Sequence, residues 1–346
     1  MKLKFVFNQI INLVNFLIFN RTLLLFKMDG IIIEVLKQEK YHIEFNLKNV
    51  FIGEANAVRR VLYDCIEGFC LKVDKIKIHK ITTIIEDFTK EIDLVPVITE
   101  KIKGKDLTKF RFKFVDKNVS SEFKLISTSQ FQWTYDGKTI EDPVTDDFVF
   151  YGLNPGDSLT FEGGIVSGIG KEHAKFSQVK HINYKPTKID KQYRGVDLYD
   201  CFMSFSTYSA KPVDDIMGEI FTVLKEKLSS FRTKIKLENE PTIEKQMIST
   251  DDMKIIVKDE DATLGGLIVP NVLIQQKGIF IGYAPIYYGE DDLQIRIGSI
   301  NQRIIEEAIE YAIKRINSLS FSKQKKTEKK KETKEKEKKT KKKGIK

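Results

Sequence analysis

The sequence has little of the chemistry from which metal centres and disulfide frameworks are built. Its 346 residues include 3 cysteines and 4 histidines. No two cysteines form a CxxC pair, so a zinc site of four thiolates is excluded, and the histidines are too scattered to complete a mixed one. So few cysteines favour a reducing intracellular compartment. We therefore expect no metal and no cofactor; these residues are Cys65, Cys70 and Cys201, and His42, His79, His173 and His181.

The chain also lacks an uninterrupted apolar run long enough to cross a membrane. Residues 1–27 are rich in apolar residues, but polar ones interrupt them at Asn8, Gln9, Asn12, Asn15, Asn20 and Arg21. A spanning helix needs about 20 consecutive apolar residues, and a signal peptide needs a small-residue cleavage site. We favour an upstream extension of the reading frame with Met28 as the functional start. A family-specific element and a membrane-active segment are the alternatives.

The positive charge is not spread over the chain. The formal net charge is +9, yet the segment from Phe321 to Lys346 holds 14 lysines and 4 glutamates, a net of +10. The other 320 residues therefore carry a net charge of −1. We expect any attraction to phosphates to reside in this tail and not on a basic domain face. The tail has almost nothing apolar to bury, so we expect it to be disordered, either as a solvating tail or as a phosphate contact.

The middle of the chain shows alternating strands and amphipathic helices. The length allows two or three domains, and 41% hydrophobic residues are enough for packed cores. Alternation over 41–47 predicts a strand, and apolar spacing over 54–68 predicts a helix ended by Gly68. Short strands and turns fill 75–180. Pro212 then suits the first turn of a long helix whose apolar stripe is Val213, Ile216, Met217, Ile220, Leu224 and Leu228.

The opening pattern then recurs. A strand at 253–257 leads through the acidic turn 259–261 to Thr263, a good N-cap for a short helix. A strand pair and a long amphipathic helix over about 304–316 follow. The two copies predict an α+β fold, and two long apolar stripes would find partners by packing against each other. From the pattern alone, two unrelated α+β domains are equally compatible.

Three segments carry a resemblance to known proteins. NVFIGEANAVRRVL at 49–62 resembles the helix of the RNA polymerase alpha family, whose usual form is an Ala-Asn-Ala-Leu-Arg-Arg run. LNPGDSLTFEGGIVSGIGKEHAKFS at 153–177 resembles the signature of the third-largest subunit of eukaryotic RNA polymerase II and of its archaeal counterpart. KDEDATLGGLIVPNVLIQQKGIFIGYAPIYYGEDDLQIRI at 258–297 resembles the small dimerisation partner of that protein, the eleventh subunit in eukaryotes, and the archaeal equivalent of this partner.

The resemblance implies that two alpha-subunit-like dimerisation halves form an intramolecular pseudo-dimer, with a mainly β insert domain in the first half. A single chain carrying both partners resembles the arrangement in large cytoplasmic DNA viruses, which would place it in the virion and the host cytoplasm, in viral factories. The expected domains are an N-terminal extension (1–27), a discontinuous first half (28–74 and 181–231), the β-rich insert (75–180), a linker (232–250), the second half (251–320) and a disordered tail (321–346).

The resemblance also implies a function, which is to nucleate assembly of the two large catalytic subunits of DNA-directed RNA polymerase without being catalytic itself. The implied partners are those two subunits and other small polymerase subunits, with DNA met only indirectly or through the tail. No membrane or small-molecule substrate is expected. The implied contacts with the large subunits are Asn56, Arg59, Arg60, Gly168, Gly170, Lys171 and His173. The implied intramolecular interface is Val58, Leu62, Ile216, Ile220, Leu224, Thr263, Leu264, Ile305, Ile309 and Ile313.

Other chemistries fail on spacing. A phosphate-binding loop ending at Gly170-Lys171 would need glycine at 165 and Ser or Thr at 172, where the chain has Ile165 and Glu172. Glu172 and His173 are neighbours that would point to opposite faces of a strand, so they do not suggest an acid–base pair. The acidic residues near 86–93 and 259–261 lack the spacing of a two-metal polymerase centre. We therefore expect no catalysis by this chain.

One departure from the family and two other functions stay open. Pro270 falls inside the short helix of the second half and predicts a shortened or bent helix there. One alternative function is a stand-alone nucleic-acid-binding protein that acts through the basic tail. The other is a membrane-anchored scaffold that uses residues 1–27.

Overall fold

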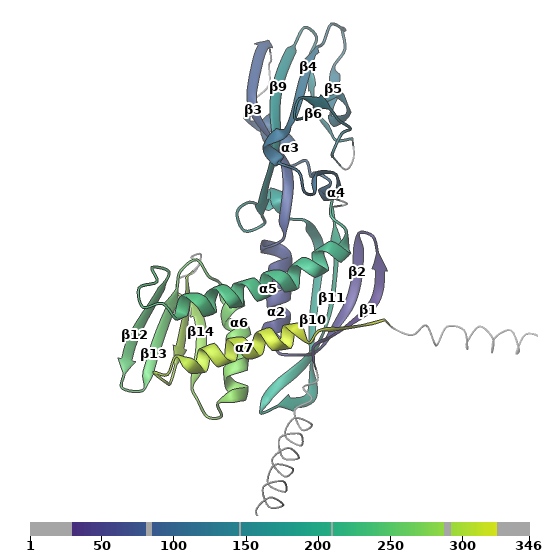
Figure 1. Cartoon of the computed structure of the whole chain (residues 1–346). Coiled ribbons are helices and arrows are strands. Elements are labelled where there is room, and N and C mark those ends of the chain that lie inside the picture. Colours follow the sequence, from purple (N-terminus) through teal and green to yellow (C-terminus); the bar gives the residue numbers. More distant parts are fainter. Residues whose placement is uncertain (1–29, 81–84, 145–146, 209, 287–291, 324–346) are drawn as a thin grey trace, which may run out of the picture.

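The computed structural model describes residues 30–80, 85–144, 147–208, 210–286 and 292–323. The expectations for residues 1–27 and for 324–346 lie outside these residues. The fold has two parts, a base of helices flanked by two sheets and an upright β-rich unit above it (Figure 1). We call residues 67–169 the β-rich unit and residues 30–66 and 174–323 the base.

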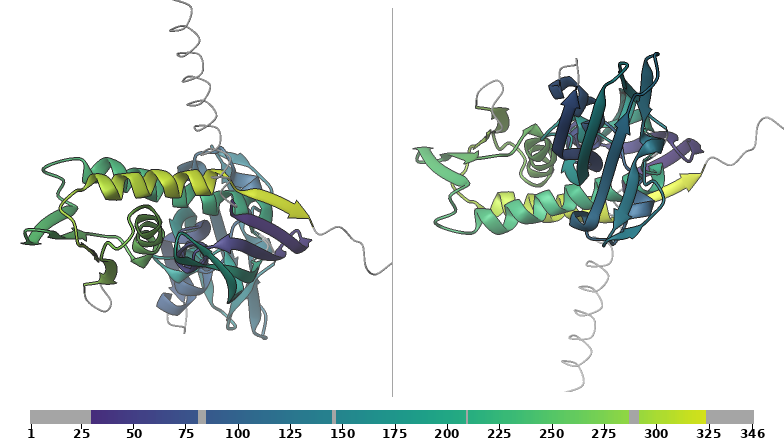
Figure 2. Two further views of the ribbon diagram at one scale, coloured as in Figure 1. Left: turned by 90° about the horizontal axis from the view of Figure 1, so that it is seen from below. Right: turned by 90° about the horizontal axis from the view of Figure 1, so that it is seen from above.

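One sheet of the base gathers strands from both ends of the chain. Its order is β10-β11-β2-β1-β16, and β16 runs parallel to β1 with Ser320 opposite Ile32 (Figure 2). We expected residues from 321 on to be disordered, but 321–323 belong to β16. The open edge of β1 offers unpaired N–H and C=O groups, which a strand can pair with whatever its side chains are. The bounds are β1 Ile32–Glu39, β2 His42–Val50, β10 Val179–Tyr193, β11 Val196–Thr207 and β16 Ser320–Lys323.

The other sheet of the base has the order β12-β13-β15-β14. Its bounds are β12 Ile243–Ser249, β13 Asp252–Val257, β14 Ile281–Pro285 and β15 Leu293–Ile297. The segment 232–250, which we expected to be a linker, contains the end of a helix and the edge strand β12. Most side chains of β12 are exposed. Its backbone pairing with β13 holds it, and a hydrophobic pattern does not reveal such a strand.

Four helices lie between the two sheets of the base. Pro212 occupies the N-cap of the long helix α5, at the boundary where the sequence predicted its start. The long helices α5 and α7 run side by side, and α2 packs against α6 (Figures 1 and 2). A single apolar core joins these helices to the inner faces of both sheets. The bounds are α2 Ile52–Asp64, α5 Val213–Ile235, α6 Ala262–Gln275 and α7 Arg303–Asn317.

The β-rich unit has its own aromatic core. Its main sheet has the order β3-β9-β4-β6-β7, and the ribbon β5-β8 and the helices α3 and α4 pack on one side of it. The pairing of β3 with β9 already starts at Glu67, opposite Ile169, before the position 75 at which we expected the insert to begin. The bounds are β3 Glu67–Lys80, α3 Ile85–Asp93, α4 Thr99–Ile102, β4 Phe110–Lys117, β5 Lys124–Ser127, β6 Gln132–Tyr135, β7 Lys138–Thr139, β8 Val149–Leu153 and β9 Ser158–Ile169.

Three further properties of the described residues concern disulfides, metal sites and membrane-spanning helices. None of the three cysteines forms a disulfide. Within the described ranges, no group of three or more His, Cys, Asp or Glu side chains could hold a metal ion. No helix in this part of the chain combines the length and the apolar character that crossing a membrane requires.

Candidate functional site at the helix crossing

Helices α2 and α6 cross where two glycines meet. A Cβ atom on Gly53 would lie 2.1 Å from the carbonyl oxygen of Gly266 and 2.9 Å from its Cα atom. Such distances are shorter than any real contact of a Cβ atom, so only glycine fits at position 53 with the helices this close. The sequence showed Gly53 merely as the residue before a helix. In the structure Gly53 lies inside α2 and faces the backbone carbonyl of Gly266 in α6.

Pro270 has a role at this crossing. A proline has no N–H to donate to the carbonyl four residues earlier, which is that of Gly266. This carbonyl is the group that faces the backbone of Gly53. A Cα–H group of glycine can donate a weak hydrogen bond to such an oxygen. Helix α6 nevertheless continues through Pro270 to Gln275, so the expected shortening is not found.

A buried ion pair ties the start of α2 to the end of α7. Arg315 Nε donates to Glu54 Oε1 at 2.7 Å, and Arg315 Nη2 donates to Glu54 Oε2 at 2.9 Å. Both residues are almost fully buried, with 2% and 4% of their surfaces exposed. The two residues are 261 positions apart in the chain. The pair therefore fixes the register between the first and the last helix of the base.

Neighbouring groups satisfy the rest of this pair. Arg315 Nη2 also donates to the carbonyl of Asn49 at 2.9 Å, and the guanidinium lies 4.4 Å from the centre of the Phe51 ring. Glu54 Oε2 accepts the backbone N–H of Phe51 at 2.9 Å. Burial by itself would lower the pKa of Arg315, but the adjacent Glu54 carboxylate raises it, so the arginine stays charged.

Neither member of this pair was among the residues predicted from the sequence to have a role. Arg315 is three residues after Ala312 on the apolar stripe of α7, so a helical projection would have placed a charge inside the core. Glu54 lies in the first turn of α2, where a carboxylate ordinarily serves the helix end. Neither position alone indicates a partner at the other end of the chain. A lone arginine on an apolar face was the available signal.

The residues expected at an intramolecular interface lie in the base core. Leu264, Ile305 and Ile309 of the second part are buried in the same apolar cluster as the expected residues of the first part. Ile313 is half-buried at its edge. Thr263 is buried but is not the N-cap, because Asp261 caps α6 by accepting the Thr263 N–H at 2.7 Å. The first-part residues are Val58, Leu62, Ile216, Ile220 and Leu224.

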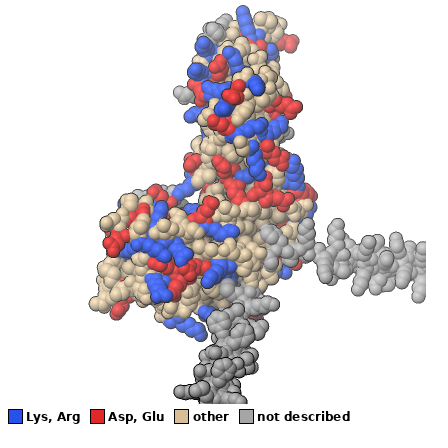
Figure 3. All heavy atoms as spheres, viewed as in Figure 1, with Lys and Arg blue, Asp and Glu red and all other residues tan. Residues whose placement is uncertain are grey.

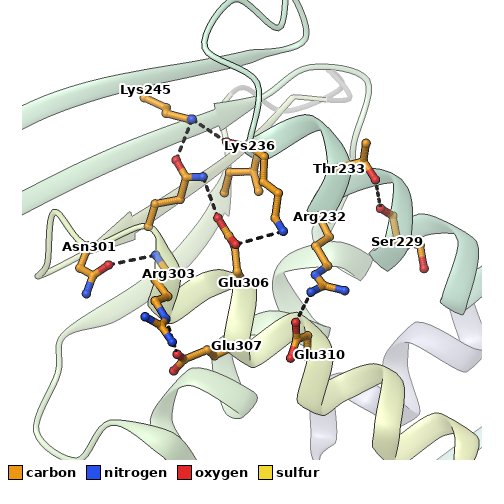
Figure 4. Close-up of polar contacts among 12 residues, drawn as sticks. Ser229, Arg232, Thr233, Lys236, Lys245, Asn301, Arg303, Glu306, Glu307 and Glu310 are labelled. Carbon is orange, nitrogen blue, oxygen red and sulfur yellow. Dashed lines mark hydrogen bonds and ion pairs between the residues drawn. The ribbon is translucent and has the colours of Figure 1, made fainter.

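A rim of ion pairs connects the exposed sides of α5 and α7 (Figure 4). Arg232 of α5 pairs with Glu310 of α7, and Lys236 pairs with Glu306 at 3.4 Å. Both pairs are partly exposed, so each stabilises the fold by about 0–1 kcal/mol. In the view of Figure 3 basic and acidic side chains are interspersed over the base. The apolar core provides most of the contact between α5 and α7, and the ion pairs favour one alignment of the two helices.

Two residues expected to face other subunits contact the acidic turn 259–261 of the same chain. Arg60 lies 3.6 Å from Asp261, and the Lys171 ammonium donates to the Asp259 carbonyl at 3.4 Å. Burial raises the pKa of the Asp64 carboxyl beside them, and the neighbouring charge of Asp261 raises it further. This side of the base therefore already pairs its charges within the chain.

Asn56 and Arg59 form a separate group on α2. Arg59 Nε donates to Asn56 Oδ1 at 2.9 Å, and its guanidinium lies 5.8 Å from the centre of the Tyr184 ring. Arg59 and Arg60 thus point to different neighbours, as adjacent residues of a helix do. Arg59 has no carboxylate partner among the described ion pairs. Its guanidinium is half-buried and available to a further acceptor.

The end of β9 and the turn that follows it contain Gly168 and Gly170, and this turn folds against the end of α2. A Cβ atom on Gly170 would lie 2.2 Å from the carbonyl oxygen of Tyr63, and one on Gly168 would lie 2.5 Å from the Phe176 ring. His173 Nδ1 accepts the backbone N–H of Lys175 at 3.1 Å, while Glu172 accepts that of Ile169 at 3.2 Å. These two side chains organise the turn. Gly170 thus permits a close approach to α2, and Gly168 permits one to Phe176, both within the same chain.

Comparison with known proteins supports a likeness to RNA polymerase subunits. No family model matches the sequence. The chain is 24% identical over 186 residues to the Mus musculus protein "DNA-directed RNA polymerases I and III subunit RPAC1", which covers 44% of this chain and 53% of that protein. The Homo sapiens and Bos taurus proteins of the same name give 24% and 25% identity with the same coverage. The chain spans about half the length of the curated relatives it matches.

Proposed function

We propose that this chain is a non-catalytic subunit of DNA-directed RNA polymerase that serves as a platform for assembling the enzyme. In this proposal two alpha-like halves form an intramolecular pseudo-dimer, with the β-rich unit inserted in the first half. The single observation that carries it is the packing of α2 on α6 and of α5 beside α7 in one apolar core. The similarity to RPAC1 supplies the polymerase context.

The internal repetition supports the pseudo-dimer. The first copy runs from β2 through α2 to α5, and the second runs from β13 through α6 to α7. Each copy contributes a sheet, a short helix at the crossing and a long helix beside its counterpart. Joining the copies in one chain raises their effective concentration to about the millimolar range, so the contact forms without a separate encounter. A fused chain would thus enter assembly with its platform already formed.

The same proposal assigns a surface to the large subunits. Asn56 and Arg59 present a guanidinium without a carboxylate partner among the described ion pairs, and arginine can bind a carboxylate through two parallel hydrogen bonds. The turn at Gly170 lies at the end of α2, and His173 caps the 3-10 turn Ala174–Phe176 that follows it. Arg60 and Lys171 keep a positioning role there, since both reach the acidic turn 259–261.

A pull-down from cells that produce the protein tests the proposal. The tagged chain should copurify with two very large polymerase subunits and with other small subunits. Arg59→Ala should reduce that recovery at least severalfold while the free chain keeps its melting temperature. Arg303→Ala is the matched control, because the Arg303 side chain lies on the exposed side of α7 and pairs with Glu307 of the same helix at 2.9 Å. Recovery of the chain without large subunits, or equal losses in both variants, would overturn the proposal.

A further inference from the structure

The outer face of the main sheet in the β-rich unit concentrates positive charge. Neighbouring side chains of a strand point to opposite faces, and Phe110, Phe112 and Phe114 of β4 enter the aromatic core. The residues between them, and those in register on β3, therefore lie on the opposite face of the sheet at the top of Figure 1. We call this surface the basic sheet face; its exposed cations are Lys72, Lys75, Lys77, Arg111, Lys113 and Lys117.

Few carboxylates balance these cations. Arg111 extends across Gly164 and pairs with Asp74 at 2.7 Å, and Lys113 pairs with Glu162 at 2.8 Å. The basic sheet face thus carries six cations and two anions, a net charge of +4. The remaining four lysines have no ion pair with any carboxylate in the part of the chain that the structure describes.

This charge stands out against the rest of the folded chain. Residues 1–27 carry four positive charges and residues 321–346 a net of +10, so residues 28–320 carry a net of −5 within the total of +9. Without the +4 of the basic sheet face, the rest of that segment therefore has a net charge of −9. The near-neutral sum led us to expect no basic domain face, and this expectation was wrong because a small net charge can include a local excess of cations on one face. A local field of this kind attracts a polyanion although the sum is small.

We propose that the basic sheet face binds the phosphate backbone of a nucleic acid. Small polar residues lie between the cations, with Ser158 and Thr160 on β9 in register with Lys117 and Lys77. Hydroxyls and lysines are typical phosphate contacts. Protein interfaces centre on large aromatic or aliphatic anchors, and Val115 is the exposed apolar side chain among these rows. The face therefore fits phosphates better than an acidic polypeptide.

The dimensions of the face suit this ligand. Alternate residues of a strand are about 7 Å apart and neighbouring strands about 5 Å apart, so the cations cover about 10 Å by 20 Å. Duplex DNA carries one negative charge per about 1.7 Å of its axis, and several phosphates fit within that area. Duplex and single-stranded DNA share this backbone. The inference does not depend on the polymerase proposal, since it concerns a surface far from the helix crossing.

The salt dependence of DNA binding by the full chain provides the test. One variant replaces the four lysines without ion pairs (Lys72→Gln, Lys75→Gln, Lys77→Gln, Lys117→Gln). The control replaces four exposed lysines outside this unit (Lys185→Gln, Lys191→Gln, Lys258→Gln, Lys277→Gln). Each phosphate contact contributes about 0.9 to the slope of log K against log salt for duplex DNA and about 0.7 for single strands. The first variant should reduce the slope by about 3 for its preferred form, and the control should leave it unchanged.

The tail is unchanged in every variant, so any contribution it makes cancels from the difference in slope. An unchanged slope in the first variant, with either DNA form, overturns the proposal. The proposal is also overturned if the first variant loses binding to polyglutamate while its DNA binding is unchanged. That result would assign the face to an acidic polypeptide. If a variant unfolds, chemical acetylation of lysines in the wild-type chain, with and without DNA, provides a second test. DNA should protect Lys75 and Lys77 but not Lys185, and equal labelling with and without DNA contradicts the proposal.

Discussion

The base and the β-rich unit bury their apolar side chains in different ways. The core of the base is mainly aliphatic and draws on residues from Ile31 to Ile316, so it closes only when distant segments of the chain meet. The core of the β-rich unit is aromatic and lies within residues 71–165, with Phe114 and Phe161 stacked at 4.8 Å. Local contacts close with less loss of chain entropy than distant ones. The base therefore depends on a few specific long-range contacts, while the β-rich unit depends on local packing.

The largest effect should follow from breaking the long-range ion pair. Arg315→Ala leaves the Glu54 carboxylate buried without a counter-charge, which destabilises a protein by about 3–5 kcal/mol. Urea denaturation should show this loss in the base. The double variant Glu54→Leu with Arg315→Met should recover most of it, because both charges are removed together. An Arg315→Ala variant as stable as the wild type would show that the pair does not hold the base.

A loss of similar size should be confined to the other region when Phe161 is truncated. Phe161→Ala removes a fully buried ring, at a typical cost of about 3–5 kcal/mol. Hydrogen exchange should speed up in the β-rich unit and not in the base. Val115→Ala on the same sheet is the control, since Val115 is 61% exposed and should change stability by less than about 0.5 kcal/mol. Equal acceleration in the base would mean that the two regions unfold as one.

A smaller effect is expected at the helix crossing. Gly53→Ala places a methyl group against the rigid carbonyl of Gly266, and such overpacking costs about 1–3 kcal/mol. The midpoint of urea unfolding should fall accordingly. If the variant unfolds at the same midpoint, α2 and α6 do not meet closely in solution.

The smallest effect should have the opposite sign. Gly218 lies within α5, and a Cβ atom there would meet nothing within 4 Å. Gly218→Ala should therefore stabilise the chain by about 0.5–1 kcal/mol, because alanine loses less backbone freedom in a helix. Thermal unfolding would reveal the gain. A destabilised variant would show that other residues of the protein pack against the outer side of α5 at this position.

The sequence predicted regular amphipathic elements well and pairwise contacts poorly. The apolar stripe beginning at Val213 and the start of a helix near Pro212 are visible in a few neighbouring residues. The edge strand β12 is not, because backbone pairing with β13 holds it while its side chains are exposed. The contacts of Gly53 with Gly266 and of Glu54 with Arg315 depend on how distant segments meet. Net charge likewise hides the basic sheet face, because its segregation appears only once β3 and β4 are in register.

Nuclear magnetic relaxation of isoleucine methyl groups tests the central claim of intramolecular docking most directly. Ile216 and Ile220 report on α5, while Ile305 and Ile309 report on α7. In a sample shown to be monomeric, all four methyl groups should share one rotational correlation time, that of the whole base. Two distinct correlation times, or a single one found only when the chain forms dimers, would contradict intramolecular docking.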